Sequence, residues 1–234
     1  MIKAKIKKIF YAFKKKNIIP IIKEQMSYEL LKDKVALIVG GTGGIGFAIA
    51  TEFLNAGCKV IITGTNELKF EKLEKKFLGS QLEKVHFMSF DLSDINQYED
   101  KVTEAEKIFG KLDILVNAAG VHTENVDFFT VTDKEYDRVT NINIKAVFFL
   151  SQVVSSYFIK NEIHGHILFI SSSRGNEPAW SPYGISKWGL NGLTKGLAMK
   201  LLPYGIIVNA IAPGVVATEL LGYNEGETIY SEEN

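Results

Sequence analysis

A tyrosine and a lysine lie four positions apart in the stretch SPYGISKWGL, as Tyr183 and Lys187. On a helix, residues at i and i+4 share one face, so the two side chains can meet. An ammonium group near a phenol favours the phenolate form, which suits the phenol for exchanging a proton with a reacting oxygen. The spacing predicts a proton-transfer pair, but it also occurs in YAFKK and YELLK and does not decide by itself.

A second chemical feature is the glycine-rich stretch VGGTGGIG at 39–46, between a β-branched apolar run and a stretch with helical periodicity. Glycine allows a tight turn and close approach to a ligand, and the following helix N-terminus offers unpaired N–H groups to a pyrophosphate. An ordinary strand-to-helix turn would also use glycine, but the position at the start of a βαβ series favours a dinucleotide site. The expected contacts are Gly40, Thr42, Gly43, Gly44, Ile45 and Gly46.

These residues need a scaffold, and the rest of the chain predicts strands that alternate with helices. Apolar strand patterns occupy 34–40, 59–63, 84–90, 114–120, 165–171 and 205–214. Helical periodicity occupies 44–57, 66–77, 131–159 and 182–202. Because this alternation indicates βαβ units, we expect an α/β fold, with a Rossmann-type doubly wound parallel sheet in three α/β/α layers.

Bulk composition limits the function classes. The 234 residues carry no formal net charge, so no nucleic-acid partner is expected. The single cysteine, Cys58, excludes an intramolecular disulfide and is typical of a reducing compartment, so we expect a cytoplasmic protein. No metal site is predicted.

The first 16 residues form a basic arm with seven lysines and no acid. A basic amphipathic helix of this kind can lie on an anionic membrane surface, and peripheral membrane association is therefore one expectation. A solvated tail and a helix docked on a partner subunit are the alternatives. We divide the chain into an N-terminal extension, 1–32, and a dinucleotide-binding and catalytic domain, 33–234. The apolar residues at helical spacing in the arm are Ile2, Ile6, Ile9, Phe10 and Phe13.

From about Asp33 onward, the GxxxGxG loop and the YxxxK pair resemble the short-chain dehydrogenases/reductases, in their single-domain branch. The resemblance implies an oxidoreductase that transfers a hydride between NAD(P) and a carbonyl/alcohol substrate, with Tyr183 as general acid/base. Val39 stands where the family usually has a threonine that helps to pin the loop. The other two tyrosine–lysine spacings precede the first strand and lack the family's serine-tipped strand upstream.

The resemblance implies four catalytic residues: Asn143, Ser172, Tyr183 and Lys187. Ser172 precedes a glycine by three positions, as the family's serine does, and would hydrogen-bond the substrate oxygen. Ser171 and Ser173 remain alternatives. Lys187 would also bind the nicotinamide ribose.

The asparagine in NINIKAVFF, Asn143, matches the family residue that holds a water behind the lysine, with Asn141 as the weaker alternative. Trp180, upstream of the tyrosine, is either a platform for the substrate or a packing residue.

Further cofactor contacts follow from the resemblance. NAAG at 117–120 looks like the family's NNAG element beside the adenosine ribose, and the acid in SFDLSD matches the one near the adenine. The PGVVAT stretch would turn the chain under the nicotinamide. The implied contacts are Asp91, Leu92, Asn117, Ala118, Gly120, Pro213, Gly214 and Thr218, together with Thr65, Tyr183 and Lys187.

The end of the second strand bears on the choice between NAD and NADP. An acid there binds the ribose 2′-hydroxyl of NAD and repels a 2′-phosphate, but this chain has Gly64. Thr65, Asn66 and Lys69 could instead donate to a phosphate. We therefore expect a preference for NADP, with NAD as the alternative.

Members of the family normally continue beyond the Pro-Gly element with a lid, a helix and a last strand. Here the last strand of the usual sheet is expected to be missing, which would expose the edge of the sixth strand. We favour a reductase or dehydrogenase for a small-molecule carbonyl/alcohol substrate, homo-oligomeric if the C-terminus is complete. The alternative is a truncated, catalytically impaired nucleotide-binding protein or assembly partner. A nucleotide-sugar epimerase or dehydratase is weaker, because those relatives use another glycine spacing and a larger C-terminal domain.

Overall fold

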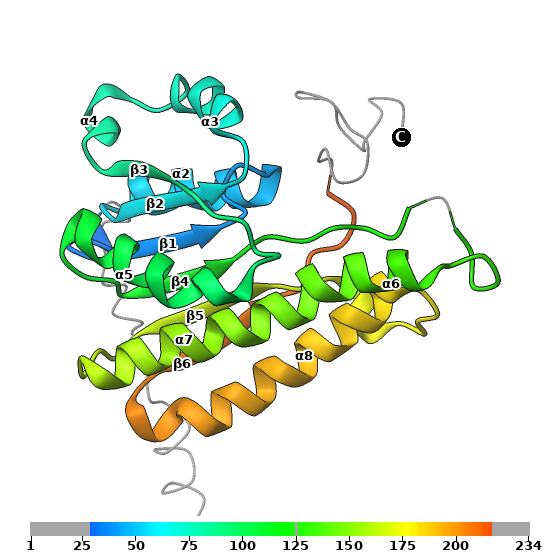
Figure 1. The fold of residues 1–234 in the computed structure, drawn as a ribbon. Coiled ribbons are helices and arrows are strands. Elements are labelled where there is room, and N and C mark those ends of the chain that lie inside the picture. The colour runs from blue at the N-terminus through cyan, green and yellow to red at the C-terminus, as the bar shows by residue number, and fades with distance from the viewer. Residues whose placement is uncertain (1–28, 125, 217–234) are drawn as a thin grey trace, which may run out of the picture.

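A parallel sheet of six strands forms the centre of the fold in the part of the chain that this computed structural model describes, residues 29–124 and 126–216 (Figure 1). The strand order is β3-β2-β1-β4-β5-β6, and every neighbouring pair is parallel. The order reverses direction between β1 and β4, which confirms the predicted doubly wound fold. The strands are β1 (Val35–Val39), β2 (Lys59–Gly64), β3 (Val85–Ser89), β4 (Ile114–Asn117), β5 (His166–Ile170) and β6 (Ile207–Ile211).

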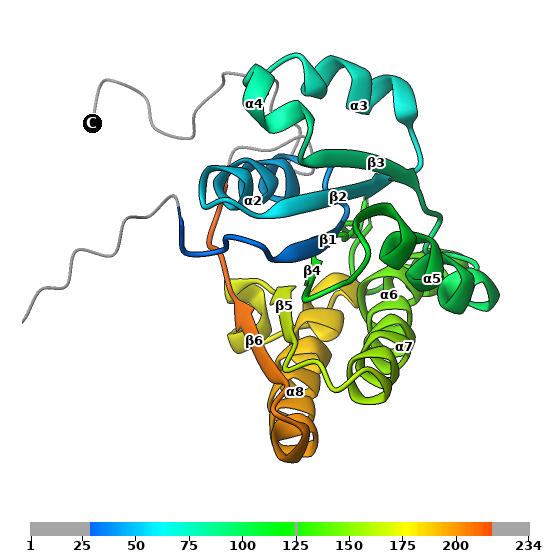
Figure 2. The ribbon, with the colours of Figure 1, turned by 90° about the vertical axis from the view of Figure 1, so that its left-hand side faces the viewer.

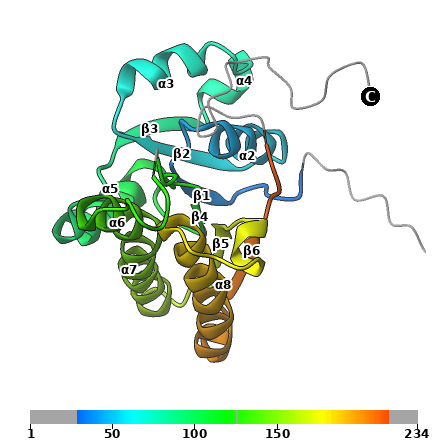
Figure 3. The same ribbon diagram turned by 90° about the vertical axis from the view of Figure 1, so that its right-hand side faces the viewer.

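Helices cover both faces of the sheet and make the expected three layers (Figures 2 and 3). Helices α2 (Gly44–Asn55) and α3 (Glu67–Glu74) lie on one face, and α5 (Tyr98–Phe109), α7 (Val147–Lys160) and α8 (Pro182–Leu201) lie on the other. Right-handed crossovers require this arrangement, because the chain moves toward β3 first and toward β6 afterwards. The shorter elements are α4 (Gly79–Leu82), α6 (Asp133–Thr140), a π-helical turn (Asn141–Ala146), and the 3₁₀ turns Ile95–Gln97, Ser173–Asn176 and Leu202–Tyr204.

Helix α5 was not among the helices expected from the sequence. Its buried residues Tyr98, Val102 and Ala105 recur at i, i+4 and i+7, so a helical signal was present among many charged residues. Tyr98 is fully buried, and its hydroxyl donates to the carbonyl of Leu92 at 2.6 Å. The helix therefore anchors the end of β3 as well as covering the sheet.

Strand β1 divides its side chains between two apolar clusters. Val35, Leu37 and Val39 pack with α5, α7 and α8, whereas Ala36 and Ile38 pack with α2 and α3. All five are at most 1% exposed. A continuous apolar run is what a strand covered on both faces requires, so the prediction of a buried first strand is confirmed.

Strand β6 is the edge of the sheet within the described residues. Ile207 and Ile211 are 46% and 51% exposed, as expected for a strand that no further described strand covers. By length and composition alone, one described helix, Asp133–Lys160, could cross a membrane. Its residues Leu150 and Phe158 are fully buried in the core of this fold. The basic arm, the two other tyrosines, the segment after 216 and Thr218 lie outside the described residues.

Candidate active site

A cleft of about 80 Å³ lies where the chain leaves the carboxyl ends of β4, β5 and β6. Ligands of doubly wound sheets bind at this edge, at the point where the strand order reverses. The lining residues come from five separate stretches of the chain, and they include most of the predicted reactive groups. They are Ile45, Ala118, Ala119, Gly120, Ile170, Ser171, Ser172, Tyr183, Lys187, Pro213, Gly214 and Val216.

The glycine-rich loop forms one side of this cleft. Gly40 has a φ of +74°, and a Cβ on it would lie 2.6 Å from the backbone nitrogen of Ala119. A Cβ on Gly46 would collide with the carbonyl oxygen of Gly40, so neither position admits a side chain. Helix α2 begins after Gly43, whose position provides no side-chain cap. The first-turn N–H groups of α2 thus suit an anion, and the loop fits the predicted pyrophosphate.

Asn117 lies beside Val39, the valine at the start of the loop. Its carboxamide is buried, 3% exposed, and neither its oxygen nor its nitrogen has a hydrogen-bond partner among the described residues. Asn117 is paired in register with Val39, where the resemblance implied a threonine. Asn117 is not among the residues that line the cleft, although Ala118 is, and its in-register neighbour Val39 is apolar.

Gly64, at the end of β2, lies against the loop. A Cβ there would lie 2.6 Å from Oγ1 of Thr42, so the glycine makes room for this threonine. Thr65 follows and is exposed. Asn66 caps α3, because its Oδ1 accepts from the N–H of Lys69 at 3.0 Å. Its amide nitrogen is the part of this side chain that can donate to a ligand.

Asp91 and Leu92, beyond β3, complete the predicted adenosine side. Asp91 is exposed, and its Oδ1 accepts from the N–H of Ser93 at 2.9 Å, which shapes the turn. Leu92 is buried. Neither residue lines the 80 Å³ cleft, which covers only the inner end of the predicted cofactor site.

Tyr183 and Lys187 meet on the first turns of α8, as their spacing predicts. Ser181 caps this helix by accepting from the N–H of Gly184 at 3.1 Å, and Pro182 starts it. The Lys187 Nζ lies 5.5 Å from the Tyr183 ring centroid and donates to the carbonyl of Ile170 at 2.9 Å. Burial lowers the pKa of Lys187 to about 8, so the amine still carries its charge at neutral pH.

The three serines after β5 have different surroundings. Ser171 donates its hydroxyl proton to Oδ1 of Asn191 at 2.6 Å, so this proton is already in use. Ser173 is placed by its backbone N–H, which donates to the carbonyl of Pro213 at 2.9 Å. The Ser172 oxygen accepts from the N–H of Arg174 at 3.2 Å and keeps its own proton for a ligand in the cleft. The geometry thus favours Ser172, the residue that the resemblance implied.

Asn143 lies in the π-helical turn between α6 and α7 and is 1% exposed, whereas the alternative, Asn141, is exposed. Its amide nitrogen donates to the carbonyl of Val121 at 2.9 Å, and its oxygen accepts from the N–H of the same residue at 2.9 Å. A Cβ on Gly120 would lie 3.5 Å from Oδ1 of Asn143 and 3.7 Å from Nζ of Lys187. Single-turn π segments often mark functional sites, and this one brings Asn143 behind the lysine.

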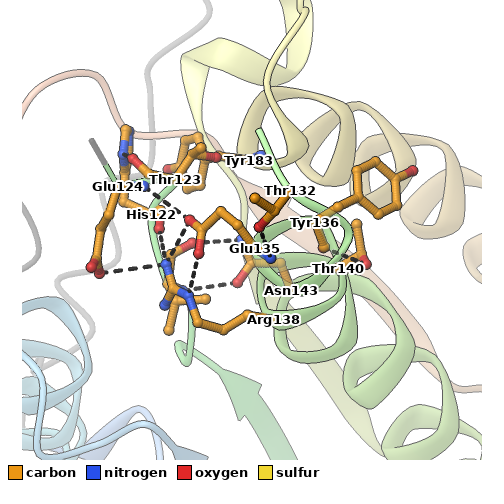
Figure 4. A network of polar contacts seen from close by, with 11 residues as sticks. His122, Thr123, Glu124, Thr132, Glu135, Tyr136, Arg138, Thr140, Asn143 and Tyr183 are labelled. Carbon is orange, nitrogen blue, oxygen red and sulfur yellow. Dashed lines mark hydrogen bonds and ion pairs between the residues drawn. The ribbon is translucent and has the colours of Figure 1, made fainter. Parts of the chain in front are cut away.

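Sequence reasoning missed two residues that contact Tyr183, His122 and Thr123 (Figure 4). The His122 ring lies against the Tyr183 ring, with centroids 4.4 Å apart and planes inclined by 34°. The N–H of Tyr183 donates to Oγ1 of Thr123 at 3.1 Å. These residues also line a second cavity of about 230 Å³, together with Trp180. Their only signal in the sequence was their position directly after the NAAG element.

Comparison with known proteins adds independent findings. A family model described as short chain dehydrogenase matches residues 34–227, a range that contains the glycine-rich loop and α8. The 3alpha-hydroxysteroid dehydrogenase of Mediterraneibacter gnavus is 34% identical over 200 residues, 83% of this chain and 78% of the relative. The solved structure of ElxO with NADP bound has a TM-score of 0.74 and 34% identity, covering 80% of this chain and 76% of that one. A 3-ketoacyl-(acyl-carrier-protein) reductase from Brucella melitensis, complexed with NADH, has a TM-score of 0.75 and 30% identity, covering 82% and 79%.

Proposed function

The chain belongs to the short-chain dehydrogenase family, and on that premise we propose how its residues carry out the reaction. It is an NAD(P)-dependent oxidoreductase that transfers a hydride between the nicotinamide and a carbonyl/alcohol substrate. One observation supports the assignment of roles above all others. A single cleft brings together Ser172, Tyr183 and Lys187, next to the glycine-rich loop and the turn at Pro213.

The residues present fit a dinucleotide. Gly40 and Gly46 leave a cradle that a side chain would fill, and the start of α2 presents N–H groups to it. We assign the pyrophosphate to this loop, the adenosine to the stretch around Asp91, and the nicotinamide to the turn at Pro213 and Gly214. Thr218, the remaining predicted contact, lies outside the described residues and stays a prediction. The bound cofactor supplies the hydride in reduction and accepts it in oxidation.

Our mechanism assigns the proton to Tyr183. Ser172 holds the substrate oxygen by donating its hydroxyl proton, and Tyr183 delivers a proton to that oxygen during reduction or removes one during oxidation. The buried ammonium of Lys187 stabilises negative charge at the tyrosine because little water screens it. The water relay predicted behind this lysine stays a prediction, since the Asn143 carboxamide is bonded to Val121 and Ser186.

We also propose that the protein prefers NADP over NAD. The support is steric as well as electrostatic: an acid at position 64 would bring its Cβ within 2.6 Å of Thr42 Oγ1. Position 64 therefore cannot carry the NAD-selecting carboxylate without displacing Thr42. Exposed donors at Thr65 and Asn66 follow directly and would donate hydrogen bonds to a 2′-phosphate.

Replacing Tyr183 by phenylalanine tests this function. The parent chain should bind NADPH more tightly than NADH by fluorescence titration and should oxidise NADPH with a carbonyl substrate. Tyr183→Phe should bind NADPH equally well and lose turnover, because only the proton donor is removed. A variant that retained turnover would refute the acid/base role, and tighter NADH binding would refute the NADP preference.

The expectations about location, membrane contact, domain boundary and oligomeric state stay proposals. A cytoplasmic location is supported by the single, buried cysteine, Cys58. Membrane contact through 1–32, the boundary after residue 32 and a homo-oligomer were predicted from sequence patterns and the resemblance. The alternative of an impaired nucleotide-binding protein is not favoured, because the relatives are dehydrogenases and reductases and the proposed reactive groups share one cleft.

A further inference from the structure

The segment that touches Tyr183, residues 121–124, connects β4 to the loop before α6 (Figure 4). It contacts the tyrosine twice, through the His122 ring at 4.4 Å between centroids and through Thr123 Oγ1, which accepts from the Tyr183 N–H at 3.1 Å. The 121–124 segment has no helix or strand pairing of its own. Side chains from other parts of the chain must therefore fix its position. Because the segment packs against the Tyr183 ring, those side chains also affect where the ring lies.

Asn143 binds Val121 at the start of the segment, and two side chains of α6 bind the residues that follow. An Arg138 Nη2 donates to the carbonyl of His122 at 2.6 Å, and Oε1 of Glu135 accepts from the N–H of Glu124 at 3.0 Å. Arg138 also binds Glu135 through two parallel bonds, Nε to Oε2 at 2.8 Å and Nη2 to Oε1 at 2.9 Å. A planar guanidinium matched to a carboxylate holds both groups in one orientation.

This pair differs from an ordinary exposed ion pair, which contributes little to stability. The side chain of Glu135 is only 16% exposed, and both partners bind the backbone of another part of the chain. Thr132 caps α6 by accepting from the N–H of Glu135 at 3.2 Å, whereas the Glu135 carboxylate reaches across to the N–H of Glu124. Bonds from Arg138 and the Glu124 N–H lower the pKa of Glu135 to about 2, so the pair stays charged at any assay pH.

We propose that Arg138 and Glu135 are positioning residues of the reaction. They fix the 121–124 segment, and this segment holds the ring of Tyr183 in the orientation that faces the cleft. The inference rests on the proposed function, in which that tyrosine exchanges the proton. Neither side chain lines the cleft, so they act on Tyr183 without touching the cofactor or substrate there. Misplacement of a reacting group by about 1 Å costs about 100-fold in rate.

The kinetic test uses Arg138→Gln, Arg138→Lys and Glu135→Gln, and the glutamine at 135 keeps the shape of the side chain while removing its charge. Glu104→Gln is the matched control, since Glu104 also pairs with a cation three residues away, Lys101, at 2.8 Å on α5. We expect kcat to fall about 10- to 100-fold in Arg138→Gln and less in Arg138→Lys, which keeps one point donor. NADPH affinity and KM should change less than about two-fold, and the control should behave as the parent.

Amide hydrogen exchange supplies a readout that does not depend on turnover. The N–H groups of Glu124 and Tyr183 should exchange faster in Glu135→Gln than in Glu104→Gln, because their segment is released. If the parent is active and the variants keep its kcat, this inference is overturned while the proposed function stands. The same holds if the loss of kcat is fully explained by the fraction of each variant that is unfolded. A parent without turnover on any carbonyl overturns the proposed function and the catalytic part of this inference, whatever the exchange rates show.

Discussion

Replacing Lys187 by methionine should change how the stability of the protein depends on pH. The side chain is 4% exposed, and burial lowers its pKa from 10.5 to about 8. Below about pH 8 the amine is charged in both the folded and the unfolded chain, so the full desolvation cost opposes folding. Between about pH 8 and 10.5 only the unfolded chain keeps the proton, and the free energy of unfolding therefore rises with pH.

The magnitude follows from these two pKa values. The difference between 10.5 and about 8 corresponds to about 3 kcal/mol over the whole window. About 2 kcal/mol of this change falls between about pH 7 and about pH 9.5. Methionine has a similar length and does not titrate. The lost bond to the Ile170 carbonyl and the changed packing therefore change the free energy of unfolding of the variant by nearly the same amount at both pH values.

Urea unfolding of parent and Lys187→Met at about pH 7 and about pH 9.5, without cofactor, measures this change. The free energy of unfolding of the parent, relative to that of Lys187→Met, should be about 2 kcal/mol higher at about pH 9.5 than at about pH 7. Lys195→Met, on an exposed position of α8, is the control and should follow the parent at both pH values. Parallel pH dependences of the parent and Lys187→Met would refute the reasoning, because the lysine would then titrate alike in the folded and unfolded chains.

Three further predictions follow from neighbouring contacts. Val39→Thr should raise the free energy of unfolding by about 1 kcal/mol, and Tm by about 2–4 °C, by giving the unpartnered carboxamide beneath the loop a hydrogen bond. Val116→Thr, at a fully buried apolar position, should lower the free energy by about 1–3 kcal/mol in the same thermal melt, and equal effects would contradict this account. Ser172→Ala should reduce kcat about 100-fold with NADPH binding retained, whereas Ser171→Ala should keep most of kcat; the reverse order in steady-state kinetics would move the role to the other serine. Gly64→Asp should weaken NADPH binding at least about 10-fold more than NADH binding in fluorescence titrations, because a carboxylate repels the 2′-phosphate; equal losses would point to the steric clash alone.

Much of the fold could be predicted because its signals are local. A strand buried on both faces must be apolar throughout, as in β1, and a helix that follows a phosphate-binding turn needs glycines at Gly40 and Gly46. The helix α5 was missed because its three buried residues stand among charged ones. The strand order comes only from the structure, and given that order the right-handed crossover rule sets the face on which each helix lies.

The predicted reactive residues are a more instructive case. Tyr183 and Lys187 share one helix, so their spacing alone places them together, and the structure confirms that contact. The resemblance favoured Ser172 over Ser171 through its spacing to the glycine three positions on, and the hydrogen bonds support the same choice on separate grounds. Both serines line the cleft, but Asn191, twenty residues away, accepts the hydroxyl proton of Ser171, whereas the Ser172 oxygen only accepts from the N–H of Arg174.

By itself, the sequence determined the parallel sheet, the glycine-rich turn before α2 and the tyrosine–lysine pair, since each depends on residues within about one helical turn or one strand-to-helix turn. Only the tertiary structure decided what surrounds that pair. The carboxamide of Asn117 has no partner among the described residues and lies in register with Val39, and His122 contacts Tyr183 while its backbone carbonyl accepts from Arg138. Contacts between segments far apart in the chain carry no fixed spacing, so no pattern in the sequence records them.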